Sequence, residues 1–321
     1  MIKGHGDDAY QYPQITMDFS SNICSHIDHS ELMAHLASMP QLLTHYPEPE
    51  AWSLERMIAQ RLGIGEDCVI VTNGATEAIY LIAQTFPYEF TILGPTFSEY
   101  EDACKMFYSE SDLTSVWFCN PNNPDGKTYL PADICTLARN YNLVVVDQSY
   151  EHYTSQPGLS AKEAVKMNRV IQIHSFTKTY CVPGLRLGFI TAHAELIAIL
   201  RQNLRPWSVN ALAIEAGKFL LHQSPVEPDL DEANRLRKAL GALKGVSVTE
   251  TFTSFMLCQL SKGKALALKD YLAREHGILI RDASNFKGLT PRHFRIASQT
   301  PAENDALVEA IADFILMTNG K

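Results

Sequence analysis

The alternation of short apolar runs with helical segments between 68 and 191 constrains the fold of this chain more than any other feature. The apolar runs lie at 68–71, 90–93, 115–119, 143–146, 170–173 and 187–191. Segments of helical character lie between several of them, at 77–85, 97–106 and 131–141. Short apolar strands separated by helices predict a mostly parallel sheet covered by helices on both faces. The expected fold class is therefore α/β.

The length of the chain and one break in its pattern predict more than one domain. A chain of 321 residues exceeds the usual size of a single domain. Residues 1–45 are irregular apart from a helix expected at 31–38, and we expect them to form an N-terminal arm and a segment of a smaller domain. Residues 46–223 should form the large domain. Residues 224–321 begin with a proline-containing break and should form a smaller α+β domain, with helices expected at 231–243, 265–276 and 301–317 and strands at 254–260, 278–281 and 293–297.

The charge and cysteine content exclude several classes of function. Lysine and arginine number 27 against 36 aspartates and glutamates, so the chain lacks the basic character of a nucleic-acid-binding protein. The seven cysteines are scattered, which predicts neither a metal site nor a disulfide framework. No apolar run is long enough to cross a membrane, and the first residues lack the apolar core of a signal peptide. We therefore expect a cytoplasmic protein with no membrane or nucleic-acid partner.

A lysine at the end of one expected strand has the surroundings of a reactive amine. Lys178 follows Ser175 and Thr177, and Arg186 precedes the next apolar run. A lysine that is desolvated or lies beside another cation loses its proton near neutral pH and then attacks carbonyl carbons. For Lys178 alone, an ordinary surface lysine in a loop would be the simpler interpretation. The residues at the other strand ends favour the reactive one.

Three other expected strands also end in polar residues, where open α/β sheets bind their ligands. Gly74, Ala75 and Thr76 open a helix and would form an anion site, although a plain capped helix start looks the same. The stretch 120–126 contains several asparagines and prolines, more than a simple turn needs. Asp147 ends an apolar strand and is followed by Tyr150. A buried carboxylate requires a partner, either a pyridinium nitrogen or a structural hydrogen bond.

Taken together, these residues resemble the fold-type I pyridoxal phosphate (PLP) enzymes of the aminotransferase class I/II family, over nearly the whole chain. The resemblance implies a large domain with a mostly parallel sheet flanked by helices, a smaller α+β domain, PLP as cofactor and a homodimer with shared active sites. It implies that Lys178, Asp147 and Tyr150 are catalytic. The cofactor contacts that it implies are Lys178 as the Schiff-base lysine, Asp147 at the ring nitrogen, Asn123 and Tyr150 at the phenolic oxygen, Phe97 against the ring, Ala75, Thr76, Ser175, Thr177 and Arg186 at the phosphate, and Tyr46 at the phosphate of the neighbouring subunit.

The resemblance also implies a substrate site. Arg295 matches the arginine that binds the substrate carboxylate. Three stretches, at 5–6 with 18–23, at 206–213 and at 278–289, are most similar to members of the family that decarboxylate L-threonine O-3-phosphate. The substrate contacts expected on this basis are His5, Asn22, Arg281 and Arg295. Two arginines at adjacent strand ends suit a substrate with a carboxylate and a phosphate, although Arg281 could instead form an ion pair with an acid such as Asp282.

The sequence departs from the family pattern in three places. Asp125 stands where the family has a threonine, Gln148 and Ser149 replace a commoner pair after Asp147, and the segment 107–115 is short, as if a strand and a helix had been removed. None of these differences removes an expected cofactor contact. The short segment leaves the order of strands in that part of the sheet open.

The expected reaction is the decarboxylation of L-threonine O-3-phosphate to 1-aminopropan-2-ol O-phosphate, with a role in cobalamin biosynthesis. One alternative is an aminotransferase of the histidinol-phosphate type, which would use the same cofactor residues. A second alternative is a non-catalytic regulatory protein on the same scaffold. Degraded copies of this kind usually lose the lysine or the aspartate, and this chain keeps both Lys178 and Asp147.

Overall fold

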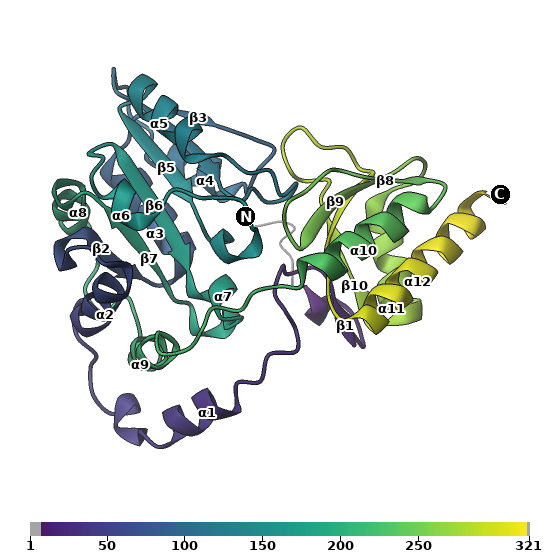
Figure 1. Ribbon diagram of the computed structural model, residues 1–321, viewed down its shortest axis with the longest axis horizontal. Helices are drawn as coiled ribbons and strands as arrows, with labels where there is room; N and C mark the ends of the chain where they lie inside the picture. The colour runs from purple at the N-terminus through teal and green to yellow at the C-terminus, as the bar shows by residue number, and fades with distance from the viewer. Residues whose placement is uncertain (1–7, 320–321) are drawn as a thin grey trace.

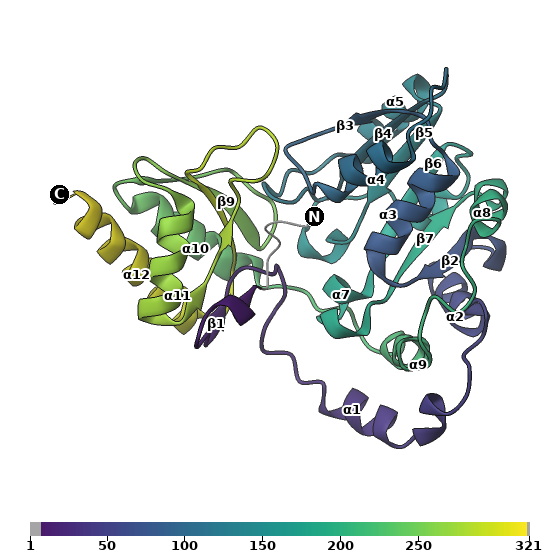
Figure 2. The ribbon, with the colours of Figure 1, turned by 180° about the vertical axis from the view of Figure 1, so that it is seen from behind.

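The computed structural model of this chain describes residues 8–319 and has two lobes (Figures 1 and 2). A six-stranded sheet forms the centre of the larger lobe, in the order β2-β7-β6-β5-β4-β3. Its strands are β2 (Val69–Thr72), β3 (Glu89–Ile92), β4 (Thr114–Cys119), β5 (Leu143–Asp147), β6 (Val170–Ser175) and β7 (Gly188–Ala192). The pairs among β3, β4, β5 and β6 are parallel, and β7 runs antiparallel to both of its neighbours. The prediction of a mostly parallel sheet is confirmed.

Helices cover both faces of this sheet because the strand residues alternate between two cores. Trp117 and Val145 face a core shared with Ile79 and Ile82 of α3, whereas Val116 and Val144 face a second core. β4 and β5 therefore contain nearly continuous apolar runs, and β6 is fully buried although it includes Gln172 and His174, as expected for a sheet buried on both sides. The helices of this lobe are α2 (Trp52–Leu62), α3 (Gly74–Thr85), α4 (Glu99–Phe107), α5 (Pro131–Asn140), α6 (Ala161–Ala164), α7 (Phe176–Thr179), α8 (Ala194–Arg201) and α9 (Ala211–Leu220).

The short segment after α4 explains one end of the sheet. Residues 108–113, all of which are described, form neither helix nor strand and lead directly into β4. β3 is consequently the edge strand, paired only with β4. The sequence left the strand order open in this part of the sheet, and the structure shows that the six-stranded sheet ends at β3.

The smaller lobe contains a four-stranded antiparallel sheet in the order β11-β12-β9-β8. Its strands are β8 (Val246–Val248), β9 (Phe255–Leu260), β11 (Arg281–Asp282) and β12 (His293–Ala297), and its helices are α10 (Leu230–Ala242), α11 (Ala265–His276) and α12 (Pro301–Asn319). Met256 and Phe294 of the sheet share a core with Leu236, Leu268 and Ile311 of the three helices. The single strand expected at 278–281 is interrupted and forms β10 (Ile278–Leu279) and β11.

The N-terminal segment joins the two lobes. β1 (Met17–Asp18) pairs in parallel with β10, and Phe19 is buried in the core of the smaller lobe. After the crossing, α1 (Ser30–Ala37) packs through Leu32 into a core of the larger lobe that includes Ala213 of α9. Residues 20–24 therefore lie between the lobes. None of the helices in residues 8–319 combines the length and the apolar character needed to cross a membrane.

Candidate active site

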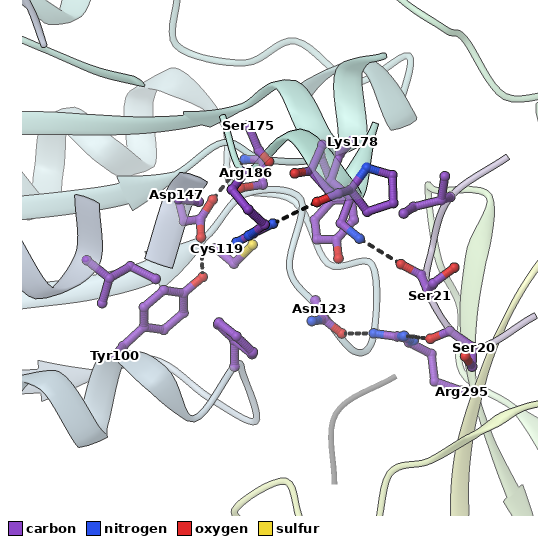
Figure 3. Close-up of a pocket in the computed structure, with 18 residues that line it drawn as sticks. Ser20, Ser21, Tyr100, Cys119, Asn123, Asp147, Ser175, Lys178, Arg186 and Arg295 are labelled. Atoms are coloured by element: carbon purple, nitrogen blue, oxygen red, sulfur yellow. Dashed lines mark hydrogen bonds between the residues drawn. The ribbon is translucent and has the colours of Figure 1, made fainter. Parts of the chain in front are cut away.

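A cavity of about 320 Å³ lies where the carboxyl ends of β4, β5 and β6 meet the start of α3 and the segment 20–23 (Figure 3). This is the edge of an α/β sheet at which ligands bind. Most of the residues expected to contact the cofactor or the substrate line it. They are Ala75, Phe97, Asn123, Asp147, Tyr150, Ser175, Thr177, Lys178, Arg186 and Arg295.

Lys178 reaches this cavity from α7, the single helical turn that follows β6. Its ammonium donates a hydrogen bond to the carbonyl oxygen of Ser21 at 2.7 Å, as Figure 3 shows. Burial, and then the charge of Arg295, lowers the pKa of Lys178 from 10.5 to about 7. A substantial fraction of the amine is therefore unprotonated at neutral pH, which a nucleophilic lysine requires.

Asp147 is the last residue of β5, and its side chain is buried. Burial raises the pKa of this carboxyl, whereas hydrogen bonds from Ser149 and Tyr100 lower it. The backbone N–H of Ser149 donates to Oδ1 at 2.8 Å, and the hydroxyl of Tyr100 donates to Oδ2 at 2.6 Å. These two bonds offset part of the cost of burying a carboxylate. Asp147 also lines the cavity, where a cationic ring nitrogen would be a further partner.

The start of α3 forms a close-packed anion site. Gly74 has φ +80°, and a Cβ atom there would lie 2.8 Å from Nη2 of Arg186. A Cβ atom on Gly188 would lie 2.8 Å from the backbone nitrogen of Ala75. The two glycines thus let the Arg186 guanidinium and the start of β7 approach the free amides of the helix. Positive charge, helix amides and the adjacent Ser175 make a site whose chemistry fits a phosphate group.

Two arginines lie opposite each other on neighbouring strands of the smaller lobe. Arg295 of β12 pairs in register with Arg281 of β11, and both side chains are buried. Arg295 donates to Oδ1 of Asn123 at 2.5 Å and to the carbonyl oxygen of Ser20, and its Nε has no hydrogen-bond partner among residues 8–319. Burial, and then the charge of Arg295, lowers the pKa of Arg281 to about 10. Within residues 8–319, neither guanidinium forms an ion pair with a carboxylate.

The alternative interpretation of Arg281 depended on an ion pair with a nearby acid. Arg281 instead donates to the backbone carbonyl of Asp282 at 2.6 Å and to Oδ1 of Asn285 at 2.7 Å. These neutral oxygens orient the guanidinium, and the carboxylates of Asp282 and Asp8 act on its charge without forming an ion pair with it in residues 8–319. A buried cation of this kind favours an anionic ligand.

Tyr150 and Phe97 form the aromatic walls of the cavity. The ring of Tyr150 lies 5.7 Å from Nζ of Lys178 and packs against Tyr153 and Phe255. Burial raises the pKa of Tyr150 to about 12, so its hydroxyl stays protonated and can donate a hydrogen bond. Phe97 packs edge-on against Tyr100 at 5.8 Å, which fixes the orientation of both rings.

Four of the expected site residues that the structure describes do not line this cavity. Asn22 is fully buried, its side chain interacts with Tyr150, and it lines a second cavity of about 210 Å³ beside the first. Arg281 lies beside Arg295 and is not part of the cavity wall. Thr76 is the residue after Ala75 in α3. Tyr46 is 88% exposed and packs against Trp207. His5 lies outside the described residues.

Several lining residues were not predicted from the sequence. They are Ser20, Ser21, Ile23, Ile79, Tyr100, Cys119, Ser149 and Pro183. Tyr100 lies three residues after Phe97, within the helix that the sequence predicted at 97–106, and that spacing is the one signal that could have identified it. Cys119 ends β4 as Asp147 ends β5, so the strand-end argument applies to it as well.

Comparisons with protein families, related proteins and solved structures agree on the family to which this chain is similar. The family model for aminotransferase class I and II matches residues 107–311. The solved structure of L-threonine-O-3-phosphate decarboxylase from Porphyromonas gingivalis is 35% identical, with a TM-score of 0.89 over 94% of this chain and 99% of that one. Threonine-phosphate decarboxylase of Salmonella typhimurium is 27% identical over 94% of this chain and 92% of its own. Histidinol-phosphate aminotransferase of Parabacteroides distasonis is 28% identical over 84% and 87%, respectively.

Proposed function

The chain belongs to the aminotransferase class I and II family of PLP enzymes, and on that basis we propose that it decarboxylates L-threonine O-3-phosphate to 1-aminopropan-2-ol O-phosphate. The observation that carries the proposal is the pair of buried arginines, Arg281 and Arg295, which face each other and have no carboxylate partner in residues 8–319. Two such cations suit a substrate with two anionic groups. The similarity to threonine-phosphate decarboxylases supports the same reaction.

The chemistry of the cavity fits PLP. Its anion site suits the phosphate, which Ala75, Ser175, Thr177 and Arg186 of the cavity wall would hold, with Thr76 of α3 as a further expected contact. When bound, the cofactor supplies a carbonyl carbon that condenses with amines and a protonated ring that accepts the electron pair of a broken bond to Cα. Phe97 would pack against the ring, and Asn123 and Tyr150 would donate hydrogen bonds to the phenolic oxygen.

Lys178 would both hold the cofactor and move the proton. With a pKa of about 7, its amine would hold the carbonyl carbon of the cofactor, and near neutral pH it could also carry a proton on Nζ. Because Lys178 lines the cavity, Nζ would be the group that supplies a proton to Cα of the substrate. Asp147 would keep the ring nitrogen protonated, because a buried carboxylate stabilises a nearby cation.

The substrate would be held by its two anionic groups. Arg295 would bind the carboxylate and Arg281 the phosphate, with Asn22 and His5 as further contacts. Fixing both ends of the substrate sets which bond to Cα stands perpendicular to the ring, and that bond is the one that breaks. The decarboxylase and the aminotransferase differ in this orientation, and the second function we consider is therefore an aminotransferase of the histidinol-phosphate type, favoured by the 28% identity to such an enzyme.

A regulatory protein without catalysis is the less favoured alternative, because Lys178 and Asp147 are both present and both line the cavity. We further propose a cytoplasmic homodimer with a role in cobalamin biosynthesis. Tyr46 supports the dimer, since its ring is exposed and lies outside the cavity of its own subunit. Its hydroxyl would then reach the phosphate in the partner subunit.

The experiment is an incubation of the purified protein and PLP with O-phosphothreonine, with and without 2-oxoglutarate. Carbon dioxide and glutamate are measured together. The decarboxylase releases carbon dioxide in both mixtures and forms no glutamate. Glutamate formed only when 2-oxoglutarate is present would establish the aminotransferase instead, and a PLP-loaded protein that yields neither product would favour the regulatory alternative.

A further inference from the structure

The carboxylate of Asp147 is held by a tyrosine from a different layer of the fold. The hydroxyl of Tyr100 in α4 donates a hydrogen bond to Oδ2 of Asp147 at 2.6 Å (Figure 3). Tyr100 is 1% exposed, so water does not compete for this bond. A hydrogen bond to a buried charged group is among the stronger interactions in a protein.

The other oxygen of Asp147 is held from the opposite side. The backbone N–H of Ser149 donates to Oδ1 at 2.8 Å, and the side chain of Ser149 also lowers the pKa of the carboxyl by hydrogen bonding. A carboxylate offers about four acceptor positions, so the bonds from Ser149 and Tyr100 leave capacity for another donor. Because Asp147 lines the cavity, that capacity is available to a group bound there. The two donors together fix the plane of the carboxylate.

Tyr100 cannot readily swing away from Asp147. Its ring packs edge-on against Phe97 at 5.8 Å and beside Trp117 at 6.4 Å. Trp117 is itself anchored, because its indole N–H donates to the hydroxyl of Ser115 at 3.1 Å. Burial raises the pKa of the Tyr100 phenol well above its usual value, so the proton between the two groups stays on the phenol.

A donor is needed here because burial alone acts against the role of Asp147. Removing a carboxyl group from water favours its neutral form, which would no longer stabilise a ring cation. A donor whose proton stays on its own oxygen favours the ionised form. Ser149 contributes through its backbone and its side chain, and Tyr100 provides the hydroxyl donor to Oδ2.

We propose that Tyr100 is a positioning residue that keeps Asp147 ionised and oriented toward the ring nitrogen of PLP. The inference rests on the cofactor assignment in the proposed function, and it does not depend on which bond of the substrate breaks. The role proposed for the Tyr100 hydroxyl is exercised through Asp147. Its contribution should therefore require both the Asp147 carboxylate and a nitrogen in the cofactor ring.

The test measures the dissociation constants of two probes, PLP and its analogue with carbon in place of the ring nitrogen. Tyr100→Phe keeps the packed ring and removes only the hydroxyl. We expect PLP to bind about tenfold more weakly to this variant, the loss of one bond to a charged group. The ring-carbon analogue should bind the variant and the wild type alike. Comparing the two probes on one variant cancels any general loosening of the fold.

The matched control is Tyr80→Phe. The hydroxyl of Tyr80 in α3 donates a hydrogen bond to the carboxylate of Glu99 at 2.8 Å, which is the same tyrosine–carboxylate interaction as that of Tyr100 with Asp147. Neither Tyr80 nor Glu99 lines the cavity. This variant should bind PLP as the wild type does. In an Asp147→Asn background, Tyr100→Phe should cause no further loss, because the two substitutions interrupt one interaction.

Equal losses for PLP and the ring-carbon analogue would assign Tyr100 a structural role and overturn the inference, as would an unchanged affinity for PLP. Either result could occur in a protein that still decarboxylates O-phosphothreonine, and it would leave the proposed function standing. A wild-type protein that binds no PLP would instead overturn the proposed function and this inference together.

Discussion

Replacing Lys178 by methionine should stabilise the protein without its cofactor, and should do so in a pH-dependent way. The lysine has a pKa of about 7 in the folded chain against 10.5 in the unfolded chain. Between these values the unfolded chain binds more protons at this site, so its free energy of unfolding rises with pH. The wild type should therefore gain stability between pH 7 and pH 10.5, and Lys178→Met should lack this gain.

The size of the effect follows from the two pKa values. Protonation linkage at this one site changes the free energy of unfolding by about 2 kcal/mol between pH 7 and pH 9. Methionine also removes the bond from Nζ to the carbonyl of Ser21, which shifts the stability by a similar amount at every pH. The pH-dependent part is therefore the informative quantity, because the lost bond cancels from it.

The assay is urea-induced unfolding of cofactor-free protein at pH 7 and pH 9, followed by tryptophan fluorescence. The free energy of unfolding of Lys178→Met minus that of the wild type should be about 2 kcal/mol larger at pH 7 than at pH 9. Lys262→Met, at an exposed lysine, is the control and should follow the wild type at both pH values. Stability curves for Lys178→Met and the wild type that run parallel would refute the burial argument for a reactive amine.

Three further predictions concern the assembled site. Asp147→Asn should fold and bind PLP but lose most of its turnover, measured as carbon dioxide release at full cofactor occupancy, and near-normal turnover would exclude the ring-nitrogen role. Arg281→Ala should lower kcat/KM for O-phosphothreonine by about tenfold or more and barely change the weak reaction with threonine. Arg295→Ala should impair the reactions with both substrates. If Arg281→Ala keeps the wild-type preference for the phosphorylated substrate, the phosphate-binding role of Arg281 is wrong. Mixing Tyr46→Phe with Lys178→Ala protein should restore activity in hybrid dimers, and subunit exchange without recovery would rule out a shared site.

The sequence predicted the large sheet and most of the cavity because both depend on local patterns. A buried strand reads as an apolar run, and the first polar residue after it marks the edge where ligands bind. Asp147 and Lys178 were found in this way, and the structure places both on the cavity wall. The fold class and the predicted helices were accessible for the same reason, since periodicity and chain breaks are local properties.

The remaining features depend on pairings between distant parts of the chain. β1 contains two residues and exists because it pairs with β10 more than 250 positions away, which no local pattern reveals. Ser20 and Ser21 contribute backbone carbonyl oxygens to the cavity, and a carbonyl carries no sequence signal. The second carboxylate donor, Tyr100, reads in the sequence as an ordinary buried aromatic residue of a helix.

The two carbonyl oxygens between the lobes affect how binding energies at this site should be interpreted. Ser21 accepts the hydrogen bond of Lys178, and Ser20 accepts one from Arg295. Any group that binds these two side chains competes with the backbone of the protein itself, so each new contact replaces an old one. The net gain per exchanged bond is then well below the full strength of a hydrogen bond. The affinity of this site for a ligand is therefore a difference in free energy between the state with these internal hydrogen bonds and the state with bonds to the ligand. Ser20 and Ser21 lie between the lobes, so both lobes take part in this exchange.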